Sequence, residues 1–292
     1  NIKIGLIVKP YEMQVFKNNP LVDIVMTNNI FSYLRNRNQW DVYIDFDLFF
    51  SEYNIICDAI LSPKYKMIIS KRDDMYYEKK GLKNYDYVIP SLADKGIHFS
   101  RVLELTPFLP FINRDNIKYH VPMDTQLIKN FDDFWHKNKI RVLLNSSGGQ
   151  ISVSYDFFKE FINILNSKFA DKVDLAILNN EMNKKFTCLP GIRETDKLNI
   201  LQYFAIAASS DIIVTPDTSL VHISGAYDKY CISFYANKKD NSVFLPLNPK
   251  KQKYFISADR NRKKDLNAFD VDTIIKCIEQ FIIDIEQQKV ST

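Results

Sequence analysis

Short runs of apolar residues alternate with amphipathic stretches over the second half of the chain. The apolar runs predict strands at residues 140–145, 173–178, 211–215 and 230–235. The amphipathic stretches between them predict helices at residues 154–168, 198–209 and 218–227. Alternation of strand and helix is typical of a parallel, doubly wound sheet. We therefore predict an α/β fold for this part of the chain.

The first half follows the same pattern less regularly. Its apolar runs predict strands at residues 2–8, 23–26, 40–46 and 66–70, with helices at 51–61 and 99–109. Residues 71–95 are rich in charge and tyrosine, and we expect a long, partly irregular surface region there. The polar segment 119–138 suits an interdomain connection that ends in a short helix at 131–136. A final helix at 271–287 carries one broad apolar stripe.

Length and composition agree with two folded domains. The chain has 292 residues, which is longer than most single domains. Its hydrophobic content of 46% is ample for a core, and only 7 glycines against 21 phenylalanines argue against disorder. The formal net charge of +4 suits phosphate-bearing or acidic ligands and is too small to indicate nucleic-acid binding.

Cysteine usage and hydropathy bear on the compartment. The four cysteines are scattered without metal-type spacing, which favours a reduced, cytoplasmic protein. No stretch reaches the ~20 apolar residues that cross a bilayer. The positive charge balance and the aromatic residues would permit peripheral contact with the inner face of a membrane.

The strongest candidate for chemistry follows the strand predicted at 211–215. The apolar run ends at Pro216, and Asp217, Thr218 and Ser219 then form a small polar cluster that can cap a helix. A strand that enters a helix through such a turn leaves backbone N–H groups free, and the helix dipole favours an anion there. His222 lies one turn into the helix and can face the same point. An ordinary capped helix with a packed histidine fits the same residues.

A second polar loop follows the strand predicted at 140–145. Residues 145–150 read Asn-Ser-Ser-Gly-Gly-Gln, whose hydroxyls and glycine backbone could surround a phosphate. By itself the loop is equally consistent with a flexible turn. In open α/β sheets, however, ligands bind beyond the carboxyl ends of the strands, where two such loops would meet. Together the two loops indicate a site for a diphosphate-bearing ligand.

The segment around His222 resembles the Asp-(Thr/Ser)-Gly-x-x-His signature of glycosyltransferase family nine, the ADP-heptose:lipopolysaccharide heptosyltransferases. Residues 198–210 resemble the helix before that signature, residues 229–236 the next strand, and residues 142–149 the strand and loop that open the family's donor domain. Residues 139–260 carry the more specific resemblance. Residues 1–120 carry a weaker one, at positions 19–23, 43–45 and 98–105.

The resemblance implies a GT-B-type fold, with two Rossmann-like doubly wound domains facing a cleft. It places an acceptor-side domain at residues 1–125, a linker at 126–138, a donor domain for the nucleotide sugar at 139–270, and a C-terminal helix at 271–292 that packs back across the domain junction. The implied activity is inverting, metal-independent transfer of a sugar, heptose or another, from a nucleoside diphosphate to a bacterial surface glycan such as lipooligosaccharide core or capsule. The nucleotide sugar is then a substrate, and no cofactor is expected. A different class remains open: an inactive sugar-nucleotide or glycan-binding protein of the same fold.

The family's roles map onto particular residues. The resemblance implies that Thr218 and Ser219 bind the donor diphosphate and that His222 stabilises the departing diphosphate. Asp217 would cap its helix or hold a sugar hydroxyl. The remaining donor contacts would come from Ser146, Ser147 and Gly148 on the first loop and from Glu194 near the nucleoside. Glu181 and Asp196 compete with Glu194 for that last position.

Two departures from the family pattern concern the donor. Ser219 stands where the signature has glycine, and a side chain there restricts how closely the backbone approaches a phosphate, although its hydroxyl can compensate. Ile151 and Ser152 occupy the stretch in which the family usually carries a lysine. The donor charge must then be met elsewhere, with Lys238 and Lys239 as candidates.

A third departure concerns the general base that inverting transfer needs. The family supplies an aspartate from a glycine-containing loop after its first strand, and nothing in this chain resembles that loop. Residues 1–8 resemble the family's second strand, so either the first strand is missing from this sequence or the base is Asp45 or Asp47. We prefer Asp47 because it lies nearer the open end of its strand; Asp45 could equally be structural. His98 and Arg101 would contact an acidic acceptor, although packing or surface roles fit them too.

Overall fold

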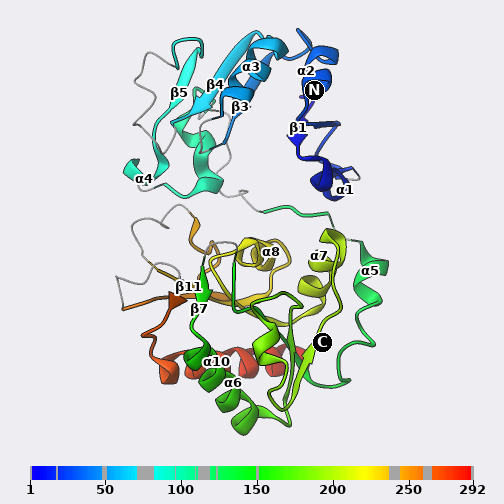
Figure 1. Ribbon diagram of the computed structural model, residues 1–292, viewed down its shortest axis with the longest axis vertical. Helices are drawn as coiled ribbons and strands as arrows, with labels where there is room; N and C mark the ends of the chain where they lie inside the picture. Colours follow the sequence, from blue (N-terminus) through cyan, green and yellow to red (C-terminus); the bar gives the residue numbers. More distant parts are fainter. Residues whose placement is uncertain are drawn as a thin grey trace. The chain divides into compact units, whose positions relative to one another are not determined.

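The computed structural model describes residues 2–17, 19–47, 51–70, 82–95, 97–108, 110, 119–122, 124–148, 151–236, 244–258 and 265–290. Its contacts divide the chain into two compact units (Figure 1). The first unit comprises Asn1–Lys118 with Ser242–Phe244, and the second comprises Tyr119–Asn241 with Leu245–Thr292.

The second unit is built on a six-stranded parallel sheet in the order β12-β11-β10-β6-β8-β9. Its strands are β6 (Ile140–Leu144), β8 (Val173–Ile177), β9 (Ile192–Glu194), β10 (Ile212–Pro216), β11 (Tyr230–Tyr235) and β12 (Gln252–Ile256). The chain starts at β6 in the middle, continues outward through β8 and β9, and then builds the other half from β10 to β12. This is the predicted doubly wound order. A separate parallel pair joins β7 (Ser152–Val153) to β13 (Asp265–Leu266).

Helices cover both faces of this sheet because its strands are apolar on both sides. The helical segments are α5 (Thr125–Lys129), α6 (Tyr155–Phe169), η6 (Lys184–Phe186), α7 (Ile200–Ser209), α8 (Ser219–Ala226) and α10 (Val271–Val290). Along β10, Ile212 and Val214 pack with α6 and α10, whereas Ile213 packs with α7 and α8 on the opposite face. The unit is therefore a three-layer α/β/α sandwich.

The first unit contains two smaller parallel sheets. One pairs β1 (Gly5–Val8) with β2 (Ile24–Thr27), and the other has the order β3 (Val42–Asp45), β4 (Tyr65–Ile69), β5 (Tyr87–Ile89). Its helical segments are η1 (Pro10–Glu12), α1 (Met13–Phe16), α2 (Ile30–Arg35), α3 (Glu52–Leu61), α4 (Leu92–Lys95) and η3 (Phe99–Leu105). The helices α2 and α3 pack against each other. Tyr33, Cys57 and Leu61 form the core under them.

Three predicted segments, 71–95, 99–109 and 131–136, differ in the structure. The helix predicted at 99–109 is a 3-10 helix that ends at Leu105. Strand β5 and helix α4 lie within residues 71–95, which were expected to be partly irregular. In the described part of the connection between the units, the helix is at Thr125–Lys129 and not at 131–136. The apolar stripe predicted for the final helix packs within the second unit. All six of its buried side chains join the core beside α6: Ile274, Ile275, Ile278, Phe281, Ile282 and Ile285.

Candidate functional site

The loops after β6 and β10 meet at the carboxyl edge of the second unit's sheet. These strands are neighbours in the sheet, with Val142 opposite Ile212 and Leu144 opposite Val214. Gly148 marks the closest approach of the two loops, since a Cβ atom there would lie 2.7 Å from Thr218 Cγ2. It would also lie 3.3 Å from the carbonyl oxygen of Asp217. The structure therefore brings together the two loops that the sequence singled out.

Helix α8 begins directly at this edge. Thr218 is its N-cap, and the Thr218 hydroxyl accepts a hydrogen bond from the backbone N–H of Leu220 at 3.2 Å. The same hydroxyl lies 2.9 Å from that of Thr215, at the end of β10. Asp217 was expected to cap its helix or to hold a sugar hydroxyl; the N-cap residue is Thr218, and the Asp217 backbone N–H donates to the Phe234 carbonyl of β11. The first helical residue, Ser219, is exposed.

His222 lies one turn into α8 and contacts a tyrosine that the sequence analysis missed. Its Nδ1 atom is 3.0 Å from the hydroxyl of Tyr119, and the two rings meet edge to face with centroids 5.2 Å apart. Burial raises the pKa of Tyr119 above its ordinary value, so the phenol keeps its proton over the usual pH range. The Tyr119 hydroxyl therefore fixes one side of the imidazole ring. No sequence signal marks Tyr119, which stands in the segment expected to be only a connection.

A buried network of amides supports the first loop from below. Asn183 is fully buried, and its Oδ1 atom accepts hydrogen bonds from the backbone N–H of Ser146 at 2.9 Å and from the Ser146 hydroxyl at 2.5 Å. Its Nδ2 atom donates to the carbonyl of Leu178 and to Asn145 Oδ1. Asn145 in turn donates to the Thr215 hydroxyl and to the Ser147 carbonyl. This network joins the ends of β6, β8 and β10.

The network changes the interpretation of Ser146. That residue was expected to hold a ligand, but it is only 1% exposed and its hydroxyl donates to Asn183. Ser146 therefore positions the loop. Ser147 and Gly148 are the half-buried residues of the loop and can meet a ligand at its surface.

Comparison with known proteins bears directly on this site. Residues 167–273, which include α7, β10 and α8, match the model of glycosyltransferase family 9 (heptosyltransferase). The resemblance to family 9 is confirmed. No curated protein matches the sequence.

Solved structures of a glycosyl transferase family 9 protein and of heptosyltransferases share the fold over nearly the whole chain. A glycosyl transferase family 9 protein from Veillonella parvula superposes with a TM-score of 0.74 at 11% identity, covering 97% of this chain and 89% of the other. The E. coli ADP-heptose lps heptosyltransferase II gives 0.73 at 11% identity, covering 97% and 90%. E. coli heptosyltransferase WaaC with ADP gives 0.65 at 14% identity, covering 96% and 91%. The GT-B-type fold class is thereby confirmed.

Glu194, the carboxylate expected near the nucleoside, is the last residue of β9. Glu194 is exposed there, and the adjacent Thr195 is buried with its hydroxyl bonded to the backbone N–H of Asn179. Glu181, a competing candidate, is paired with Lys184 at 2.7 Å, and that lysine lowers the pKa of Glu181. Glu194 thus lies at the carboxyl end of an edge strand, in the same sheet whose strands β6 and β10 lead into the two candidate loops. Lys238 and Lys239 lie outside the described residues.

In the first unit, the two candidate bases differ in exposure. Asp45 is 6% exposed at the end of β3, and its Oδ1 atom accepts a hydrogen bond from the backbone N–H of Asp47 at 2.8 Å. Burial, together with the charges of Asp58 and Asp45, raises the pKa of Tyr43. Asp45 therefore belongs to a buried cluster of carboxylates and phenols. Asp47 is exposed, and its Oδ2 atom accepts from Asn54 at 3.3 Å.

His98 and Arg101, the candidate acceptor contacts, both have partners within the first unit. His98 is the N-cap of η3, and its Nδ1 atom accepts from the backbone N–H of Ser100 at 3.1 Å. Arg101 makes a two-pronged ion pair with the buried carboxylate of Glu104, with both distances 2.7 Å. The carboxylate raises the pKa of Arg101. The Arg101 side chain is still 46% exposed and can offer its outer face to an anion.

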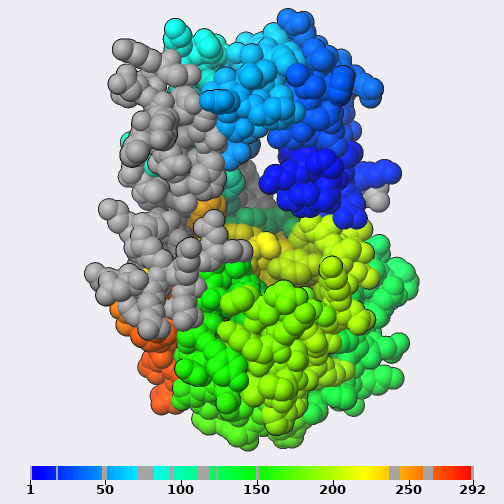
Figure 2. All heavy atoms as spheres, in the orientation of Figure 1, coloured from blue at the N-terminus to red at the C-terminus, as the bar shows by residue number. Residues whose placement is uncertain are grey.

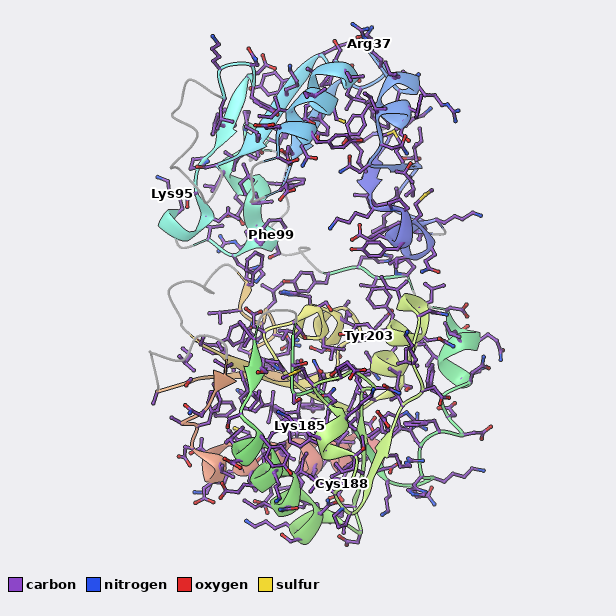
Figure 3. All side chains as sticks on the ribbon, in the orientation of Figure 1. Arg37, Lys95, Phe99, Lys185, Cys188 and Tyr203 are labelled. Carbon is purple, nitrogen blue, oxygen red and sulfur yellow. The ribbon has the colours of Figure 1, made fainter. Side chains whose placement is uncertain are left out.

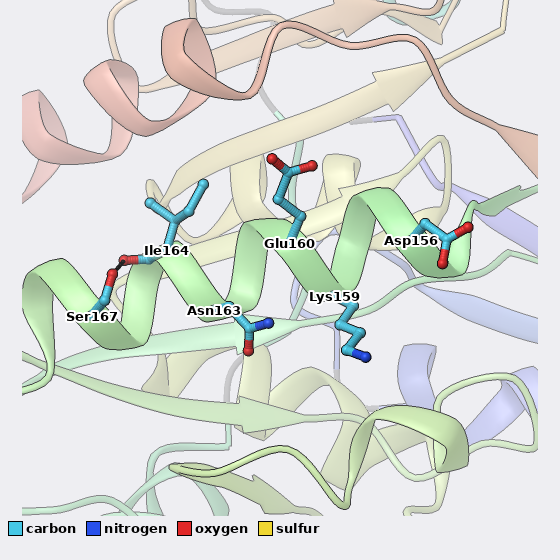
Figure 4. Close-up of a pocket in the computed structure, with 6 residues that line it drawn as sticks. All are labelled: Asp156, Lys159, Glu160, Asn163, Ile164 and Ser167. Carbon is cyan, nitrogen blue, oxygen red and sulfur yellow. Dashed lines mark hydrogen bonds between the residues drawn. The ribbon is translucent and has the colours of Figure 1, made fainter.

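The described residues offer other features that do not form a site. A shallow hollow of about 500 Å³ lies along α6, but a single helix face lines it (Figure 4). Tyr203 of α7, labelled in Figure 3, places its hydroxyl 3.3 Å from that of Ser219 and so borders the start of α8.

The described part of the chain contains no group of three or more His, Cys, Asp or Glu placed to hold a metal ion. None of its helices is long and apolar enough to span a membrane.

Proposed function

We propose that the protein is an inverting glycosyltransferase that moves a sugar from a nucleoside diphosphate to a bacterial surface glycan. The observation that carries the proposal is the junction of the Ser147–Gly148 loop with the start of α8, with His222 one turn into that helix. The family-9 match over residues 167–273, which include the start of α8 and His222, supports the proposal, and the structures that superpose include a heptosyltransferase with ADP.

The diphosphate binds at the amino end of α8. The first N–H groups of this helix and the positive end of its dipole attract an anion. The Gly148 backbone can approach the phosphates closely because it carries no Cβ atom. Thr218 and Ser219 add hydroxyl groups at the same point. This arrangement holds a diphosphate without a lysine in the first loop.

His222 stabilises the leaving group. As the bond to the sugar breaks, negative charge builds on the diphosphate oxygen, and a fixed donor near that oxygen lowers the barrier. Tyr119 occupies Nδ1 of His222, so Nε2 is the nitrogen that faces the phosphate. Positive potential from α8 and His222 replaces the charge of a metal ion, and the transfer is metal-independent.

Asp47 is the general base. An exposed carboxylate can accept the proton of the acceptor hydroxyl as that oxygen attacks the anomeric carbon, whereas the buried Asp45 orients the backbone of Asp47. Arg101 contacts an acidic group of the acceptor. The E. coli enzyme that superposes is an ADP-heptose heptosyltransferase, and heptose is one candidate donor sugar here. Ser219 stands where the family signature has glycine, so the proposal covers another donor sugar as well.

Separate measurements of binding and turnover test these roles. The His222→Ala variant should lose about 100- to 1,000-fold in release of nucleoside diphosphate from the sugar donor, with donor affinity changed only a few-fold. Asp47→Asn should lose turnover and keep donor affinity. Asn163→Ala, on the exposed face of α6, is the matched control.

The outcomes separate the two classes of function. If the parent chain turns over the sugar donor and the His222→Ala variant does not, the result supports the transferase. Tight nucleotide binding without turnover, with any bacterial glycan acceptor and donor sugar, would instead favour an inactive sugar-nucleotide-binding protein. Failure of every nucleotide to bind would contradict both.

A further inference from the structure

The end of β3 reverses the usual placement of apolar and charged side chains. Asp45 is only 6% exposed, whereas the next residue, Phe46, is 37% exposed. Phenylalanine is ordinarily among the most buried residue types, and aspartate among the most exposed. Asp47, which follows, is exposed as well. Two adjacent residues therefore present an aromatic ring and a carboxylate at the surface of the first unit.

Hydrogen bonds anchor the chain on both sides of Phe46. The Oδ1 atom of Asp45 accepts from the backbone N–H of Asp47 at 2.8 Å, which closes a turn with Phe46 at its centre. Asn54 of α3 donates to Asp47 Oδ2 at 3.3 Å. The exposed ring of Phe46 is therefore presented by a turn that its neighbours hold in place.

Contacts between rings hold the Phe46 side chain itself. Its ring meets that of Phe99, the first residue of η3, edge to face with centroids 6.3 Å apart. Phe99, labelled in Figure 3, lies in turn 5.7 Å from the ring of Phe244. Phe244 belongs to the first unit, although the chain on either side of Ser242–Phe244 belongs to the second. Three segments that are far apart in sequence thus support one exposed ring.

The contact between Phe46 and Phe99 also joins the two segments of the candidate acceptor side. Asp47 directly follows Phe46, and His98 directly precedes Phe99. Arg101 lies two residues beyond Phe99 on η3, with its side chain 46% exposed. The sequence analysis chose the carboxylate and the two basic residues from separate segments, and only the structure connects them.

The exposed ring lies where sheets of this kind bind ligands. Phe46 follows the last residue of β3, at the carboxyl edge of the parallel β3-β4-β5 sheet. In Figure 2 the lighter blue atoms, which include β3, border an opening in the surface of the first unit. Sites for small ligands combine aromatic side chains with a few polar groups that fix orientation. Phe46, Asp47 and Arg101 supply this combination.

We propose that the exposed ring of Phe46 is the platform on which a sugar ring of the acceptor stacks. One face of a pyranose ring consists of C–H groups, which are attracted to the electron-rich face of an aromatic ring. The hydroxyls at the rim of the stacked sugar then meet Asp47, and an acidic substituent meets Arg101. That the stacked sugar is the acceptor rests on the proposed function, whereas the stacking itself does not.

Simple glycosides test the platform without nucleotide or sugar transfer. Methyl β-D-glucopyranoside offers one ring face made of axial C–H groups, and methyl β-D-glucuronide offers the same face with a carboxylate added. Titration of residues 1–292 with each glycoside is followed by NMR. Nuclear Overhauser contacts should join the axial hydrogens of both sugars to the ring hydrogens of Phe46. The glucuronide should bind about tenfold more tightly, because its carboxylate meets Arg101.

Variants at Phe46 separate the aromatic ring from its apolar volume. Phe46→Leu removes the ring, so affinity for both glycosides should fall about tenfold or more. Phe46→Tyr keeps the ring and should bind them as the parent does. Phe31→Leu is the matched control, because Phe31 is an exposed phenylalanine of α2 outside this ring cluster, and it should also bind as the parent. In turnover, Phe46→Leu should raise KM for a glycan acceptor that the parent uses, and leave KM for the sugar donor unchanged.

Three results would overturn the platform. Equal affinity of Phe46→Leu and the parent for the glycosides would show that the ring contributes nothing. Overhauser contacts that miss Phe46 would place the sugar elsewhere, and no binding of either glycoside by the parent would remove the stacking. Nucleotide binding by the second unit is measured separately. Its absence would contradict the proposed function and leave a sugar stacked on Phe46 standing.

Discussion

At the scale of single residues, the candidate site depends on side chains below the surface as much as on those of the motif. Ser146 belongs to the motif but is buried, and Asn183 holds it in place. Tyr119 plays a similar part for His222. Both supporting residues act by fixing the geometry of a neighbour, which makes their contribution separable from direct contact with a ligand.

Replacing Asn183 tests this supporting role. Asn183→Ala leaves the Ser146 hydroxyl and the Leu178 carbonyl without partners in a buried place, so we expect about 1–3 kcal/mol of destabilisation per group left unpaired. Nucleotide affinity should fall as well, because the first loop loses its anchor. Urea unfolding measures the change in stability, and calorimetric titration measures the change in nucleotide affinity. Asn166→Ala is the control, because the hydrogen bond from the Asn166 side chain to the Pro190 carbonyl is exposed. Unchanged stability would show that the network contributes little.

At the scale of elements, the site is set by the meeting of a short loop with the first turn of α8. Strand β10 carries the chain to Pro216, Thr218 caps the helix, and Gly148 allows the neighbouring loop to pass close to both. The close approach depends on the absence of a side chain at residue 148. The arrangement of the two loops is therefore sensitive to a single methyl group.

The Gly148→Ala variant tests the loop arrangement. The new Cβ atom would lie 2.7 Å from Thr218 Cγ2, so the loop must move away from α8. We expect nucleotide affinity to fall about tenfold or more, which corresponds to about 1.4 kcal/mol. Gly5→Ala meets the ring of Trp40 in the first unit and should lower stability while leaving nucleotide affinity unchanged. Equal nucleotide affinity for Gly148→Ala and the parent would contradict the close-approach account.

At the scale of the whole molecule, the two units differ in how far their sheets are built. Among the described residues, the second unit has a six-stranded sheet with apolar cores on both faces and a separate strand pair. The first unit has two small sheets. We expect the second unit to dominate cooperative unfolding, and its buried thiol and phenol groups then make stability depend on pH.

The buried thiol and phenol groups predict that the protein loses stability at alkaline pH. Burial raises the pKa of Cys231, from 9.0, and of Tyr203 and Tyr227, from 10.0, to about 12 in each case. At pH values above the pKa that each group has in the unfolded chain, the unfolded chain loses the proton and the folded chain keeps it. Stability therefore falls as pH rises from about 9 towards 12. Lys229 opposes this, because burial lowers its pKa. Each group that titrates only in the unfolded chain contributes about 1.4 kcal/mol per pH unit.

The Cys231→Ala variant isolates one of these contributions. It removes the thiol that titrates first, so the decline in stability between pH 9 and 10 should be shallower than in the parent, whatever the variant's overall stability. Urea midpoints measured at a series of pH values give the comparison. Identical slopes would show that the protonation of Cys231 does not differ between the folded and unfolded chain, which would contradict the raised pKa.

Much of the second unit could be predicted from the sequence, because buried parallel strands leave uninterrupted apolar runs such as Ile212–Pro216. The site loops were predicted for the same reason, since they follow those runs. Strand β12 was missed because Gln252 and Lys253 interrupt its apolar pattern. The role of Asn183 could not be predicted, because its partner Ser146 is 37 residues away in sequence.

The first unit was harder to predict for a physical reason. Strands β1 and β3 are only partly buried, so polar and apolar residues mix along them and their bounds are less distinct. Tyr119 was missed because a lone aromatic residue in a polar connection carries no periodic signal. Where side chains meet across long stretches of sequence, only the structure shows the contact.

The central claim, that the second unit binds a nucleoside diphosphate, is tested most directly by thermal unfolding of residues 1–292 with ADP, UDP, GDP or CDP, each with and without magnesium. A ligand at a hundred times its dissociation constant adds about 2.7 kcal/mol to stability, which raises the melting temperature by several degrees. We predict such a rise with one nucleotide, equal with and without magnesium, and reduced to about half or less in Gly148→Ala at the same concentration. No rise with any nucleotide would leave the start of α8 and His222 as an ordinary capped helix and contradict the proposed function.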